Sequence, residues 1–262
     1  MIPRMPITLS MCTIAWRADR RSYAGPNLAR PLPEVLAAIR DAGFTGAELW
    51  GPHVAAFGAA GVREQLARIG LSAPMLSDYY NFTRSAESAA ASLAHARTVL
   101  AMAREVGAGA IRIFTGNHRS ADASEEQWNR CADCLRTLCD EAAPDGIVLA
   151  AELHDWNLMD TPDGAERLLA LVARPNLRLI FHPSLFGAGA VATWERLRRH
   201  VHHVHATNGE AGLAGGPVDY PALLARLRSD GWSGALSVEW FGDEPEAVAR
   251  REAAYLRRLL ES

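Results

Sequence analysis

The chain repeats one pattern eight times from end to end: a short apolar run followed by apolar residues at helical spacing. Short runs of this kind are typical of strands, and apolar residues at i, i+3, i+4 and i+7 indicate one buried helix face. The predicted strands are residues 7–12, 46–50, 71–76, 110–114, 147–156, 176–181, 201–206 and 235–240. The predicted helices are residues 31–42, 62–69, 85–106, 124–143, 161–172, 192–200, 221–229 and 244–260. Eight alternations without a long linker predict an α/β fold, a single (β/α)8 barrel domain over residues 1–262.

The length of the chain fits this fold. Its 262 residues are close to the roughly 250 that are typical of one such barrel. The main rival is a doubly wound open sheet, which binds nucleotides at a glycine-rich turn after a strand. No G-x-G-x-x-G turn follows any of the predicted strands. The barrel is therefore the preferred architecture.

Composition and charge exclude several classes of protein. Hydrophobic residues make up 49% of the chain and charged residues 22%, as in an ordinary globular protein. The formal net charge of -3 argues against nucleic acid as the main partner, since such binders concentrate positive charge. No apolar run approaches the ~20 residues of a membrane span, and the opening residues MIPRMPITLS do not resemble a signal peptide. We therefore expect a cytoplasmic protein that acts on a small molecule.

Three of the four cysteines cluster in one predicted helix, in the sequence NRCADCLRTLCDEA. A C-x-x-C pair can bind zinc, but no second ligand pair follows at the spacing of a zinc finger. Cys131 shares a helical stripe with Trp128, Leu135 and Leu138. We therefore expect these cysteines to be core or surface thiols, reduced as in a cytoplasmic protein.

The most informative stretch is residues 147–156, with the sequence IVLAAELHDW. Its apolar first half predicts a strand buried on both faces. Glu152 and His154 are two residues apart, so on an extended chain their side chains project from the same face. A single glutamate at a strand end often does no more than contact water. Here it is accompanied by other polar residues at neighbouring strand ends.

In a parallel barrel the carboxyl ends of all strands meet at one mouth, where barrel enzymes keep their catalytic residues. The fifth to the eighth predicted strands supply Glu152, His182, His205 and Glu239, in that order. Two carboxylates and two imidazoles suit one divalent metal ion, Mn²⁺, Co²⁺, Zn²⁺, Fe²⁺ or Mg²⁺. They also leave coordination positions open for a substrate, as a catalytic site requires.

Further side chains are expected at the same mouth. Tyr79 and His154 are candidate proton donors, and Arg112 suits a substrate carboxylate. Aromatic side chains suit the C–H faces of a sugar or cyclitol ring, although packing at the barrel rim explains any one of them equally well. The residues predicted to contact substrate are Arg112, Trp50, His53 and Trp16.

At these residues the chain resembles the xylose isomerase-like TIM barrels, the sugar isomerase/epimerase superfamily. Within it, the chain looks most like the 3-dehydroshikimate dehydratases of catecholate siderophore biosynthesis. The resembling segments cover nearly the whole chain: LSMCTIAWR, GFTGAELWGPH, LSDYYNF, IRIFTGNHRSAD, ELHDWNLMDT, RPNLRLIFHPS, VHHVHATN and LSVEWFGDE. Members of the superfamily are often dimers or tetramers, so the resemblance leaves a homo-oligomer open.

The resemblance implies a divalent metal held by Glu152, by an acid on the sixth strand, by His205 and by Glu239. It also implies substrate contacts near Tyr79, Arg112 and His154. Two positions depart from the dehydratase pattern. His182 stands where the sixth strand usually carries Asp, and Thr207 replaces a lysine just after the seventh-strand histidine.

The chemistry expected from this resemblance is removal of a proton next to a carbonyl, with Glu152 or Glu239 as the base. Loss of a β-hydroxyl then gives a dehydratase, which we favour, whereas reprotonation gives a sugar or sugar phosphate isomerase or epimerase. A remote alternative is a non-catalytic metal- or ligand-binding homologue. An abasic-site endonuclease shares the fold, but the acidic net charge argues against it.

Overall fold

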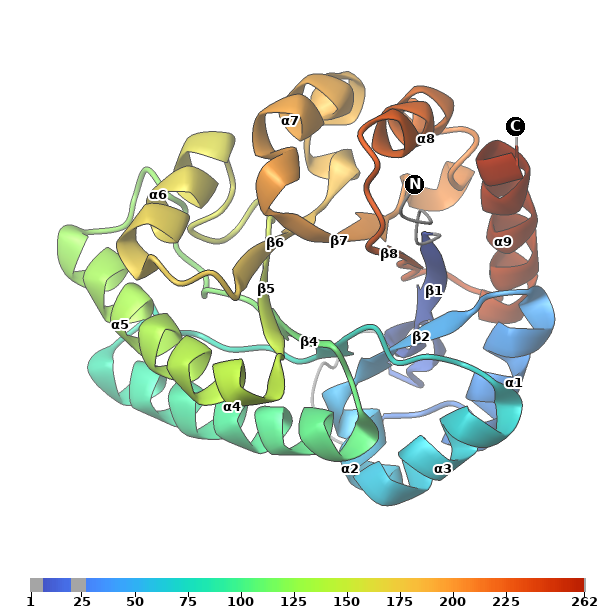
Figure 1. Cartoon of the computed structure of the whole chain (residues 1–262), viewed down its shortest axis with the longest axis horizontal. Coiled ribbons are helices and arrows are strands. Elements are labelled where there is room, and N and C mark those ends of the chain that lie inside the picture. Colours follow the sequence, from blue (N-terminus) through green and yellow to red (C-terminus); the bar gives the residue numbers. More distant parts are fainter. Residues whose placement is uncertain (1–6, 20–26, 262) are drawn as a thin grey trace.

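The computed structural model describes residues 7–19 and 27–261, and these form a closed parallel barrel surrounded by helices (Figure 1). The strands pair in chain order, and β8 closes the barrel on β1. The strands are β1 (Thr8–Cys12), β2 (Gly46–Trp50), β3 (Leu76–Ser77), β4 (Ala110–Ile113), β5 (Val148–Glu152), β6 (Leu177–Phe181), β7 (Val201–Ala206) and β8 (Ala235–Val238). The predicted (β/α)8 barrel is therefore confirmed.

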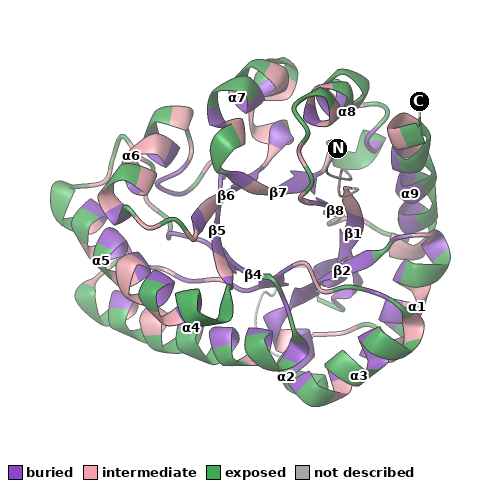
Figure 2. Ribbon diagram, viewed as in Figure 1, coloured by how far each residue is buried: buried purple, intermediate pink, exposed green. Residues whose placement is uncertain are grey.

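The helices lie outside the barrel, and their exposed faces point away from it (Figure 2). They are α1 (Leu32–Ala42), α2 (Gly51–Phe57), α3 (Ala59–Ile69), α4 (Ala86–Val106), α5 (Glu125–Ala142), α6 (Pro162–Val172), α7 (Ala190–Leu197), α8 (Tyr220–Ser229) and α9 (Pro245–Glu261). Short 3₁₀ helices are η1 (Thr13–Trp16), η2 (Ala143–Asp145), η3 (Pro183–Leu185), η4 (Gly187–Gly189), η5 (Arg198–His200) and η6 (Gly209–Ala211). Within the described residues, no helix is both long and apolar enough to cross a membrane.

The cysteine-bearing helix α5 shows how local sequence sets an element. Ser124 accepts a hydrogen bond from the backbone N–H of Gln127, whose side chain in turn accepts from the backbone N–H of Ser124. This reciprocal pair satisfies two N–H groups that have no partner inside the helix. Trp128 and Cys131 lie on the buried face, and the cysteines are free thiols. The prediction that these cysteines are core or surface thiols is confirmed.

The segment after β2 differs from the prediction. The strand expected over residues 71–76 is reduced to β3, with one isolated bridge between Gly46 and Ser72. Pro74 lies in this segment, and proline has no N–H to donate to a strand ladder.

The sequence also did not reveal α2, which directly follows β2. Pro52 lies in its first turn, where a missing N–H costs nothing, and Gly58 ends it with a φ of 92°.

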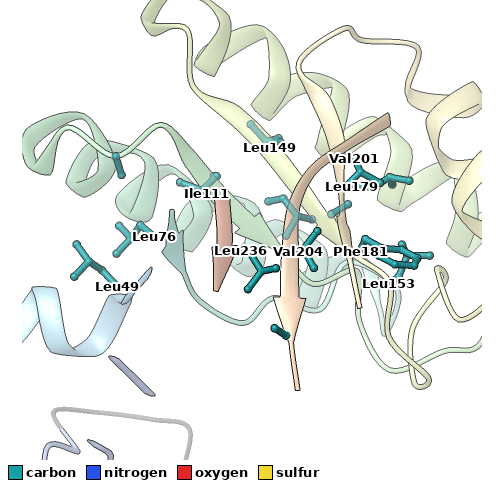
Figure 3. Close-up of a cluster of buried hydrophobic side chains, with 14 of the residues drawn as sticks. Leu49, Leu76, Ile111, Leu149, Leu153, Leu179, Phe181, Val201, Val204 and Leu236 are labelled. Atoms are coloured by element: carbon teal, nitrogen blue, oxygen red, sulfur yellow. The ribbon is translucent and has the colours of Figure 1, made fainter. Parts of the chain in front are cut away.

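The period-two alternation of the strands divides the core into two layers. Leu149, Leu179, Val204 and Leu236 are buried in the main apolar cluster, which includes the inner faces of the helices (Figure 3). Ala150, on the opposite face of β5 from Leu149, belongs to a small separate cluster with Met75, Ala110 and Ile180. These four apolar residues fill one layer of the barrel interior. Toward the carboxyl ends of the strands, the interior becomes polar.

Candidate metal centre and substrate cavity

The four predicted ligands meet at the carboxyl ends of neighbouring strands. Glu152 is the last residue of β5, and His205 is the fifth residue of β7. His182 and Glu239 directly follow β6 and β8. One potential ligand atom from each of the four lies within 4.8 Å of the others. We call these residues the four-residue cluster.

Pairs within the cluster are in direct contact. Nδ1 of His205 lies 2.8 Å from Oε1 of Glu152, and Nε2 of His182 lies 3.2 Å from Oε2 of Glu239. The cluster is largely shielded from water, since the side chains of Glu152, His205 and Glu239 are at most 5% exposed. Buried carboxylates require positive partners. The donor types, their spacing and their charge therefore fit one divalent cation.

Electrostatics around the cluster favour ionised carboxylates. Burial by itself would raise the pKa of Glu152, but Arg112 and His205 lower it below its ordinary value. Burial would likewise lower the pKa of His205, but the carboxylates of Glu48 and Glu152 raise it well above the ordinary value. A protonated His205 is thus one way to balance these negative charges, and a divalent cation is another.

Arg112 and Tyr79 form one wall beside the cluster. Nη1 of Arg112 lies 3.3 Å from Oε2 of Glu152, and Nη2 donates to the backbone oxygen of Asp78 at 3.4 Å. The guanidinium carbon lies 4.2 Å from the centre of the Tyr79 ring, a cation–π contact. Burial raises the pKa of Tyr79 to about 12, so the phenol keeps its proton at neutral pH.

The cluster opens into a cavity of about 660 Å³, a size that suits a small molecule. Its lining residues are Tyr79, Arg112, Phe114, Asn117, Glu152, His154, Trp156, His182, Thr207, Glu239 and Phe241. A polar annex of about 330 Å³ adjoins it, lined by His154, Asp155, His182, Ser184 and Leu185. Trp156 is 59% exposed and Phe241 38%, so the cavity mouth carries apolar rings facing solvent.

Three residues predicted to contact substrate are buried in the fold and not exposed in this cavity. Trp16 is buried, and its Nε1 donates to Glu246 at 2.8 Å. Trp50 is fully buried, and its ring meets that of His53 edge to face. Burial lowers the pKa of His53 to about 4. None of the three lines the cavity described above.

Among the cavity residues to which sequence reasoning gave no role are Phe114, Asn117 and Trp156. Phe114 follows β4 directly, and Asn117 lies in the same loop. The rule that polar and aromatic residues at strand ends face the mouth could have identified both. Trp156 lies four residues beyond β5, where the loop conformation decides its direction. No sequence signal fixes that conformation.

The fold and this site define a class of protein, a (β/α)8 barrel with a candidate metal centre at the carboxyl ends of its strands. Residues 36–259 match the family described as the xylose isomerase-like TIM barrel. Because the match spans most of the chain, the chain belongs to this family.

Individual relatives have low sequence identity to this chain. A 3-dehydroshikimate dehydratase of Bacillus anthracis is 24% identical over 94% of this chain and 95% of its own. The crystal structure of the probable 3-DHS dehydratase involved in petrobactin synthesis from the same organism has a TM-score of 0.81 at 23% identity, with coverages of 96% and 99%. An L-ribulose 3-epimerase structure has a TM-score of 0.83 at 20% identity, with coverages of 97% and 95%. A xylose isomerase-like barrel protein from Mycobacterium smegmatis, in complex with magnesium, has a TM-score of 0.74 at 18% identity, with coverages of 98% and 96%.

Proposed function

We propose that this chain is a divalent-metal-dependent lyase that dehydrates a polyhydroxylated ring ketone bearing a carboxylate, of the 3-dehydroshikimate type. The observation that carries the proposal is the four-residue cluster, three of whose members line a cavity together with Arg112 and Tyr79. The similarity to a 3-dehydroshikimate dehydratase along almost the whole chain supports the choice of substrate.

Glu152, His182, His205 and Glu239 would hold the metal ion. A bound divalent cation supplies Lewis-acid chemistry, because it offsets negative charge that develops on a substrate carbonyl oxygen. The similar Mycobacterium smegmatis protein was solved in complex with magnesium, which agrees with binding of a divalent cation. The charge of Arg112, buried beside the cluster, suits the substrate carboxylate.

Proton removal requires a base within reach of the carbon next to the carbonyl. Glu152 contacts both Arg112 and His205, so its negative charge is strongly stabilised and its basicity is low. Glu239 contacts only His182 among the ion pairs of the described residues. We therefore assign proton abstraction to Glu239, and orientation of the site to Glu152.

Dehydration also requires a proton for the departing hydroxyl group. The C–H bond breaks, its electron pair becomes the new carbon–carbon double bond, and the C–O bond on the neighbouring carbon breaks. Tyr79 and His154 line the cavity, and either can protonate the departing oxygen so that it leaves as water. The phenol of Tyr79 holds its proton at neutral pH, as a general acid must.

The direct test is incubation of Mn²⁺-loaded protein with 3-dehydroshikimate, followed by ultraviolet absorbance of the catechol product. We expect catechol formation, and a loss of about 10²- to 10⁴-fold in rate for Glu239→Gln, the range typical of general acid–base residues. Glu64→Gln, on the exposed face of the outer helix α3 and outside the cavity lining, is the matched control and should keep the wild-type rate. Metal-loaded wild-type protein that yields no catechol would contradict this substrate class.

A second candidate function is sugar 3-epimerisation. The cluster carries carboxylates from two separate places in the barrel, Glu152 on β5 and Glu239 after β8. Two acids on different sides of a carbon can remove a proton from one face and return it to the other. The structural similarity to an L-ribulose 3-epimerase agrees with this chemistry. Incubation with L-ribulose in D₂O would detect it as deuterium at carbon 3.

A further inference from the structure

A third carboxylate lies beneath the four-residue cluster. Glu48 is the central residue of β2, and it is 1% exposed. β1 and β8 lie between β2 and β7 in the closed barrel, so contact between β2 and β7 must cross the interior. Oε2 of Glu48 nevertheless lies 3.1 Å from Nε2 of His203 and 3.1 Å from Nε2 of His205. Burial of a carboxylate is costly unless it is hydrogen-bonded, so this cross-barrel contact requires an explanation.

His205 uses both of its ring nitrogens. Nδ1 faces Glu152 in the four-residue cluster at 2.8 Å, and Nε2 faces Glu48. A neutral imidazole carries a hydrogen on one nitrogen and a lone pair on the other. Only the tautomer with the hydrogen on Nε2 presents a lone pair on Nδ1 toward the cluster. Glu48 accepts a hydrogen bond from that tautomer.

We propose that Glu48 is a positioning residue, which accepts a hydrogen bond from Nε2–H of His205 and thereby presents Nδ1 of that ring as a metal ligand. The proposal rests on the metal site of the proposed function. His203 holds Glu48 from a second side, and Oγ of Ser237 lies 2.7 Å from the same Nε2 of His203. A carboxylate that orients a ligating histidine also makes the ring a stronger donor, and its loss typically weakens metal binding 10- to 100-fold.

The first test is Glu48→Gln, with the dissociation constant of Mn²⁺ measured by the electron paramagnetic resonance signal of the free ion. Glutamine has the same shape but no charge, so we expect Mn²⁺ binding to weaken about 10- to 100-fold. The matched control is Glu252→Gln. Glu252 is also buried, but it accepts from the backbone N–H of Leu213 outside the cluster. Its substitution should leave the Mn²⁺ dissociation constant unchanged.

A second measurement uses the wild-type protein and therefore does not depend on whether Glu48→Gln folds. Nitrogen-15 NMR of histidine-labelled protein loaded with Zn²⁺ should show a hydrogen on Nε2 of His205 and the metal on Nδ1. Metal on Nε2 would overturn the proposal, as would unchanged Mn²⁺ affinity in a folded Glu48→Gln variant. Wild-type protein that binds no divalent metal would instead contradict the metal site itself, so the two failures are distinguishable.

Discussion

His182 is the member of the four-residue cluster whose identity most affects metal choice. Its Nε2 contacts Glu239, and its Nδ1 lies 2.8 Å from Oγ of Ser184. Imidazole is a borderline ligand that suits Zn²⁺ or Co²⁺, whereas carboxylate oxygen favours Mg²⁺ and Mn²⁺. We predict that His182→Asp still binds metal but shifts the ratio of Zn²⁺ to Mg²⁺ affinity toward Mg²⁺ by about tenfold or more.

Competition titrations with the two ions measure this ratio. His154→Asp is the control, because His154 lines the same cavity but lies outside the four-residue cluster. The His154→Asp variant makes the same histidine-to-aspartate change, and its ratio of Zn²⁺ to Mg²⁺ affinity should equal that of the wild type. Identical selectivity in His182→Asp and wild-type protein would remove His182 from the metal site.

At the scale of single elements, α5 is an outer helix whose start is set by the reciprocal pair Ser124 and Gln127. Ser124→Ala removes the acceptor for one backbone N–H of the first turn. We predict that the free energy of unfolding in urea falls by about 1 kcal/mol. The rate of catalysis should not change, because α5 lies outside the barrel (Figure 1) and none of its residues lines the cavity.

Ser229→Ala is the matched control for this helix cap. Its hydroxyl donates to the backbone oxygen of Arg226 at an exposed helix end, and such surface changes usually alter stability by less than about 0.5 kcal/mol. Equal losses of unfolding free energy in the two variants would show that the cap of α5 has no special role.

At the scale of the whole molecule, a metal ion in the four-residue cluster would connect β5, β6, β7 and β8. Any ligand that binds only the folded state stabilises it, by about 2.7 kcal/mol at a concentration 100 times its dissociation constant. We predict that Mn²⁺ at this excess raises the free energy of unfolding by this amount, and that a chelator reverses the gain.

The barrel should remain folded in the chelator. The carboxylate of Glu152 already has His205 and Arg112 as partners, so its burial does not depend on a metal ion. Thermal unfolding in the presence of Mn²⁺ tests the predicted stabilisation. Thermal unfolding in the presence of the chelator tests whether the barrel stays folded without the ion. A double variant, Glu152→Gln with Glu239→Gln, should lose the Mn²⁺ effect. If Mn²⁺ stabilised this variant as much as it stabilises the wild type, the ion would bind outside the four-residue cluster.

The sequence determined the order of the elements and the mouth at which the polar residues gather. Strand and helix periods are local properties, and parallel strands in a closed barrel send all their carboxyl ends to one side. This rule alone predicted that Glu152, His182, His205 and Glu239 converge. It also predicted that Arg112 and Tyr79 lie beside them.

Only the tertiary structure decided which residues of the interior touch one another. Trp16, Trp50 and His53 lie at or just after strand ends, as the cavity residues do, yet they are buried and do not line the cavity. Glu48 reaches His205 across the barrel, a contact between residues far apart in the chain. Such contacts depend on strand register, tilt and rotamers, which are set by packing around the whole barrel and leave no periodic trace in the sequence.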